Sequence, residues 1–81
     1  MVMPQMPLAM VGSQEVVTVV GIRAGRGLTQ RLAEMGLTPG VTLKVLGGSR
    51  PGPVLVNLRG SRVALGFGVA QKIMVEKSRD G

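Results

Sequence analysis

The side chains with which small domains usually cross-link themselves are missing from this sequence. It contains no cysteine and no histidine, which excludes disulfides and metal sites built on thiolate or imidazole ligands. Tryptophan and tyrosine are also absent, and there is one phenylalanine. A chain of 81 residues buries only roughly 60% of its unfolded surface. The sequence therefore predicts one small domain that is stabilised by the packing of aliphatic side chains.

Positive charge limits the classes of partner. Ten lysines and arginines are set against four aspartates and glutamates, a net charge of +6. Such a surface favours an anionic partner: nucleic acid, nucleotide phosphates, a membrane face or an acidic protein. No apolar run reaches the ~18 residues that a membrane helix needs. The N-terminus also lacks the basic start of a signal peptide, so we expect a cytoplasmic protein.

Short runs of alternating apolar residues between glycine and proline turns predict an all-β fold. Two prolines in the first seven residues exclude a helix and weaken a strand, so residues 1–13 are expected to form a tail or a loosely docked extension. Residues 14–77 are expected to form one small SH3-like or OB-like barrel, and residues 78–81 a second tail. The expected strands are residues 15–22, 41–46, 54–58, 62–65 and 73–76, with one helical turn within residues 66–71.

One short helix is expected over residues 28–35, after the first main strand. Leu28, Leu32 and Met35 follow one another at i, i+4 and i+7 and form a single apolar stripe. Gly36 is expected to end the helix in the left-handed conformation, with Leu37 contacting Leu32 as in a Schellman motif. The helix should therefore have a well-defined C-terminus.

Two turns are also expected from glycine and proline positions. Pro39 and Gly40 occupy the two central positions of a type II turn, where proline fixes φ and glycine accepts a positive φ. Gly60 and Ser61 are expected to form the two-residue loop of a β-hairpin. Gly36, Pro39, Gly40 and Gly60 are therefore interpreted as structural residues.

The sequence offers no catalytic constellation. Its four carboxylates are scattered over a helix, two strand ends and the C-terminus, and none belongs to a local ligand cluster. We therefore expect no enzyme activity, no cofactor and no dedicated metal site. The carboxylates are Glu15, Glu34, Glu76 and Asp80.

Residues 30–40 carry the most specific pattern of the chain. They contain the run Arg-Leu-x-x-Met-Gly-Leu-x-Pro-Gly, and two hairpin strands follow it. With residues 19–22 before it and residues 52–56, 63–65 and 70–75 after it, this run resembles the FeoA family of small ferrous iron transport proteins. The resemblance spans roughly residues 8–77. It implies an SH3-like barrel with a short helical insertion after the first strand.

The resemblance also implies a function. Members of the family are accessory proteins of the ferrous iron permease FeoB, a membrane protein with a cytoplasmic G domain, and are thought to act by protein–protein contact. On this basis the partner-binding candidates lie on and around the helix. Arg31, Leu32 and Met35 match the family motif, and Arg26 and Leu28 lie beside them. Core packing is an alternative role for the two leucines.

Two other functions stay open at the level of sequence. A basic nucleic-acid-binding barrel fits the net charge, but single-strand binders stack bases on aromatic rings and Phe67 is the only ring available. Domains related to the FeoA family also occur at the C-terminus of iron-dependent transcriptional repressors. A free-standing relative of that repressor domain is therefore the third interpretation.

Overall fold

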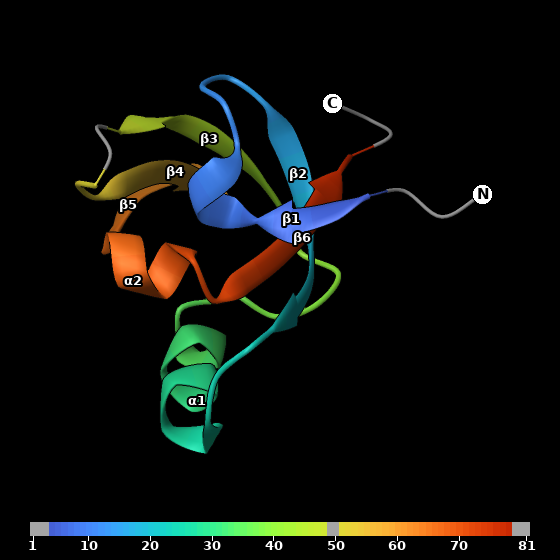
Figure 1. Ribbon diagram of the computed structural model, residues 1–81, viewed down its shortest axis with the longest axis vertical. Helices are drawn as coiled ribbons and strands as arrows, with labels where there is room; N and C mark the ends of the chain where they lie inside the picture. The colour runs from blue at the N-terminus through green and yellow to red at the C-terminus, as the bar shows by residue number, and fades with distance from the viewer. Residues whose placement is uncertain (1–3, 49–50, 79–81) are drawn as a thin grey trace.

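The computed structural model describes residues 4–48 and 51–78 of the chain (Figure 1). Six strands form one antiparallel sheet in the order β1-β6-β2-β3-β4-β5. The sheet curls into a small barrel, and one helix protrudes from it (Figure 1). The all-β prediction with a helix inserted after the first main strand is confirmed. The elements are β1 (Gln5–Pro7), η1 (Leu8–Met10), β2 (Val16–Ile22), α1 (Arg26–Glu34), β3 (Thr42–Gly48), β4 (Val54–Leu58), β5 (Ser61–Leu65), α2 (Phe67–Ala70) and β6 (Ile73–Lys77).

The core is built from alternating aliphatic side chains of the strands. Successive residues of a strand face opposite sides of the sheet, so one set lies inside the barrel. On β2, Val17 and Val19 are buried, whereas the opposite face is half-buried. The register with β6 shifts between Val19 and Gly21, which marks a bulge in β2. The remaining buried strand residues are Leu43, Val45, Val54, Val56, Leu58, Leu65, Ile73, Met74 and Val75.

The N-terminal segment is part of the barrel rather than a loosely docked extension. β1 pairs with β6, with Met6 opposite Val75, and Leu8 in η1 is fully buried. Proline is compatible with this arrangement because β1 is an edge strand and Pro7 is its last residue. The prolines therefore limit the length of β1 without preventing its pairing. At the other end Ser78 is buried and its N–H donates to the carbonyl of Val16 over 3.0 Å, while residues 79–81 lie outside the described residues.

Helix α1 begins two residues before the predicted start and ends one residue before the predicted end, with Met35 as its C-cap. Gly36 has a φ of +91°. Its N–H donates to the carbonyl of Ala33 over 3.0 Å, and the N–H of Leu37 donates to the carbonyl of Leu32 over 2.8 Å. These two bonds form the Schellman motif, and both leucines are buried. The predicted cap is confirmed.

The two predicted turns differ in outcome. The type II turn is confirmed, since Gly40 has a φ of +96° and the N–H of Val41 donates to the carbonyl of Thr38 over 3.1 Å. The hairpin loop lies one residue earlier than predicted. Its central residues are Arg59 and Gly60, with φ of +53° and +83°, which indicates a type I′ turn. The error arose because a non-glycine residue occupies a left-handed position.

Replacing Gly36 by alanine should destabilise the protein by about 1–2 kcal/mol, because a Cβ disfavours the left-handed conformation. A Cβ at Gly36 would lie 3.7 Å from a methyl group of Leu58, an ordinary contact, so backbone strain alone is tested. Gly27→Ala is the matched control. Gly27 lies inside α1 with no neighbour near its Cβ direction, and alanine there should leave stability unchanged or raise it. Equal melting temperatures for the two variants would contradict the cap.

The N-terminal segment can be tested in the same way. Leu8→Ala should destabilise the fold by about 2–5 kcal/mol, because it leaves a cavity in the core. Met10→Ala, two residues further on and 60% exposed, should change stability by less than about 0.5 kcal/mol. Urea unfolding of both variants measures the difference. A Leu8→Ala variant as stable as the parent protein would show that η1 is not part of the cooperative core.

Candidate functional site

Helix α1 stands outside the strand ladder and is attached to the barrel through its C-terminal half. Figure 1 shows α1 projecting from one end of the barrel, below α2. Leu32 is buried, Leu28 is half-buried, and Met35, the C-cap residue, is 44% exposed. The predicted apolar stripe therefore runs from the core to the surface. The C-terminal end of α1 therefore presents apolar area to solvent.

An open groove runs between α1 and the junction of β5 with α2, and we refer to it as the α1 groove. Its volume is about 190 Å³. One wall comes from α1 and its C-cap, and the other from a segment roughly thirty residues later in the sequence. The first wall consists of Leu28, Arg31, Leu32 and Met35, and the second of Ala64, Leu65, Gly66 and Val69.

Arg31 contributes the charge of the groove. Its side chain is exposed, and it forms no ion pair with any residue that the structure describes. Guanidinium groups bind carboxylates by donating two parallel hydrogen bonds. Arg31 is therefore placed to bind a carboxylate of a partner next to the apolar surface of the groove. Glu34 is also exposed on α1, but it does not line the groove.

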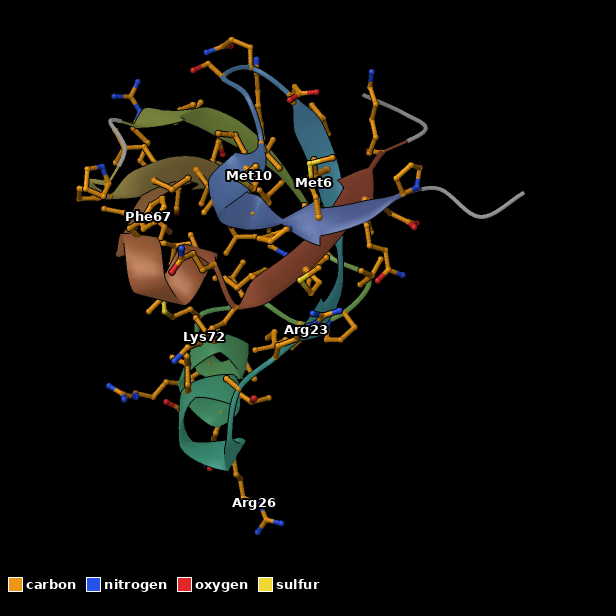
Figure 2. All side chains as sticks on the ribbon, in the orientation of Figure 1. Met6, Met10, Arg23, Arg26, Phe67 and Lys72 are labelled. Carbon is orange, nitrogen blue, oxygen red and sulfur yellow. The ribbon has the colours of Figure 1, made fainter. Side chains whose placement is uncertain are left out.

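Four of the five predicted partner-binding residues meet in the α1 groove. Arg26 does not, because it lies at the N-terminal end of α1 and points away from the barrel (Figure 2). Sequence analysis missed the second wall, including Ala64 and Val69. The helical turn predicted within residues 66–71 is present as α2, but no local pattern indicates that this segment faces α1.

Metal-binding groups are dispersed in the structure. Within residues 4–48 and 51–78, no three histidine, cysteine, aspartate or glutamate side chains come together. Glu15 accepts a hydrogen bond from the N–H of Gly12 over 2.8 Å and so has a structural role. In the same part of the chain, no helix is long and apolar enough to cross a membrane.

These features define the class of the protein: a small SH3-like barrel with one inserted helix and an apolar groove at the joint between them. The FeoA domain model matches residues 6–77 of this chain. The chain therefore belongs to the FeoA family, and the resemblance found in residues 30–40 is confirmed.

Individual relatives agree with this assignment. The chain is 45% identical over 75 residues to a protein of Methanocaldococcus jannaschii that is named as an Fe(2+) transport protein A. The match covers 93% of this chain and 90% of that protein. It superimposes on the crystal structure of an iron uptake regulatory protein, FeoA, with a TM-score of 0.84 and 39% identity, covering 93% and 99% of the two chains. A manganese-dependent transcriptional repressor matches with a TM-score of 0.85 and 25% identity over 96% of this chain and 44% of the repressor.

The isolated protein should bind Fe(II) weakly, without a stoichiometric micromolar site. It has no histidine or cysteine, and its described carboxylates are dispersed. Anaerobic titration calorimetry with ferrous sulfate measures this directly, with the same titration into buffer as the control. A saturable one-to-one heat signal at micromolar concentration would contradict the prediction.

Proposed function

We propose that this protein is a non-enzymatic accessory of ferrous iron uptake that regulates the permease FeoB by binding to its cytoplasmic side. Membership of the FeoA family and the name of the M. jannaschii relative support the link to ferrous iron transport. The protein acts in the cytoplasm, and its partner brings it to the inner face of the membrane. The observation that carries the proposal is the α1 groove, where exposed apolar surface adjoins Arg31.

The composition of the α1 groove favours a protein partner. Protein interfaces have an apolar centre with a polar rim, and methionine and arginine are enriched in them. Met35 and Arg31 supply these residue types on the same wall of the groove. Met35 also adapts well to a partner surface because its side chain is unbranched and flexible.

Nucleic acid is a weaker candidate for this site. The one aromatic ring of the chain, Phe67, is half-buried and packs against the core cluster at the start of α2. Figure 2 places Phe67 on the barrel, away from α1. A ring held against the core presents less of its face for base stacking than a free one. The basic residues remain able to bind phosphate, but the groove beside them is lined by aliphatic side chains.

Arg31→Glu should lower the affinity for the cytoplasmic part of FeoB by about tenfold, because it places like charges together in the complex. The fold should be retained with only a small decrease in melting temperature, since Arg31 is exposed and contributes only the weak stabilisation of a cation in the last turn of α1. Lys44→Glu is the matched control, because it makes the same change of net charge on β3, outside the α1 groove. Titration calorimetry with the purified cytoplasmic part of FeoB measures both variants.

The salt dependence gives a second readout for the same site. The difference between the parent protein and Arg31→Glu should shrink as ionic strength rises, because exposed charges are then screened. Met35→Lys should weaken binding at every salt concentration, since it removes apolar contact area. If neither variant changes the affinity, the docking site lies elsewhere, with the arginines of the β4–β5 hairpin as the next candidate.

A further inference from the structure

Strand β5 ends the sheet and leaves one side of its backbone unpaired. It pairs with β4 alone, and β4 and β5 are joined by the two-residue loop of Arg59 and Gly60. A two-residue hairpin closes with a hydrogen-bonded pair, here Leu58 and Ser61, and the pairs then alternate along the ladder. The N–H and carbonyl groups of Arg62 and of Ala64 therefore point away from β4. In the part of the chain that the structure describes, neither residue makes a backbone hydrogen bond to another element.

This free edge adjoins the α1 groove. Ala64, whose N–H and carbonyl point away from β4, also lines the groove, together with Leu65 and the residues of α1. Backbone donors and acceptors, aliphatic side chains and the guanidinium of Arg31 are thus presented side by side. An extended polypeptide can use all three at once, since its backbone pairs with the edge while alternate side chains enter the groove.

The two edge strands of the sheet differ in length and in proline content. β1, the opposite edge, has three residues and ends at Pro7, which has no N–H to offer a further strand. β5 has five residues and no proline. A longer edge without proline is the one suited to accept an additional strand.

We propose that β5 binds an extended acidic segment of the partner as a seventh strand of the sheet, with an apolar side chain of that segment in the α1 groove and a carboxylate at Arg31. The inference rests on the proposed function, because the segment is taken to belong to the cytoplasmic side of the permease. To the proposed function it adds two things. The first is the mode of recognition, which is backbone pairing at Arg62 and Ala64, and the second is the acidic and apolar character of the segment.

Charge selects this occupant over a second copy of the chain. Arg62 is exposed on β5 and Arg31 lines the neighbouring groove, within a protein of net charge +6. A second β5 would bring another Arg62 to the same edge, and like charges on paired strands are destabilising. An acidic strand instead places carboxylates opposite both arginines.

Hydrogen exchange tests the proposal at single residues. In the free protein the amides of Arg62 and Ala64 should exchange rapidly, and those of Val63 and Leu65, already bonded to β4, slowly. Saturation with the purified cytoplasmic part of FeoB should slow exchange at Arg62 and Ala64 by about tenfold or more. The amides of Val63 and Leu65 should change much less. This alternation is specific to strand addition, because a partner that only covers the groove shields neighbouring amides without it.

A pair of variants provides an independent measurement. Ala64→Pro removes one outward N–H without removing a bond to β4, so it should weaken binding by about tenfold while a melting curve shows the fold retained. Ala64→Ser keeps the N–H while changing the same groove-lining side chain, so it should weaken binding much less than Ala64→Pro. If the proline variant does not fold, the exchange pattern still decides the question.

The outcomes separate the inference from the proposed function. A complex in which Arg62 and Ala64 continue to exchange rapidly would overturn strand addition and leave the partner assignment intact. Failure to form any complex would overturn both. A free protein that sediments as a dimer, with both amides already protected, would show that a second copy occupies the edge and would also overturn the proposal.

Discussion

The Schellman cap that joins Leu32 on α1 to Leu37 after it is the interaction on which the placement of α1 depends. Gly36 allows the chain to reverse between them, and the Schellman bonds fix the reversal. Because both leucines are buried, the same contact that ends the helix also attaches it to the barrel. Without it, α1 would be a nine-residue helix too short to be stable alone. The α1 groove exists because the helix is held at this end.

A core without rings or cross-links explains why the N-terminal segment is incorporated. Small domains bury a limited fraction of their surface, and aliphatic side chains contribute only about 1.5–3 kcal/mol each when fully buried. Leu8, Ala9 and Val11 are buried, so the segment supplies three side chains to a core that has few to spare. In a protein with so few core side chains, the exposure of Met35 beside the core indicates a surface that can bind a partner.

Local sequence patterns predicted the strands, the helix cap and the type II turn because each depends on a few adjacent residues. The alternation of apolar and polar residues along β3 correctly places Leu43 and Val45 in the core. The glycines at positions 36 and 40 adopt the positive φ that their turns require. Patterns failed where the deciding contact was distant or atypical. The docking of Leu8 depends on pairing with β6 nearly seventy residues away, and Arg59 accepts a conformation normally given to glycine. The far wall of the groove could not be predicted for the same reason, since only the curling of the sheet brings Val69 close to α1.

The two edge strands of the sheet, β1 and β5, differ in what opposes their pairing with another strand. A sheet of six strands has two free edges, and each is a site for unwanted pairing unless something opposes it. At β1 pairing is opposed by the short length of the strand and by Pro7, which lacks an N–H. At β5 the opposition is electrostatic, because Arg62 repels another copy of itself. A short edge with a missing donor weakens pairing with any strand, whereas a charge disfavours only strands of like sign. An edge that carries arginine therefore remains able to pair with an acidic strand, which is the selectivity that the proposed docking requires.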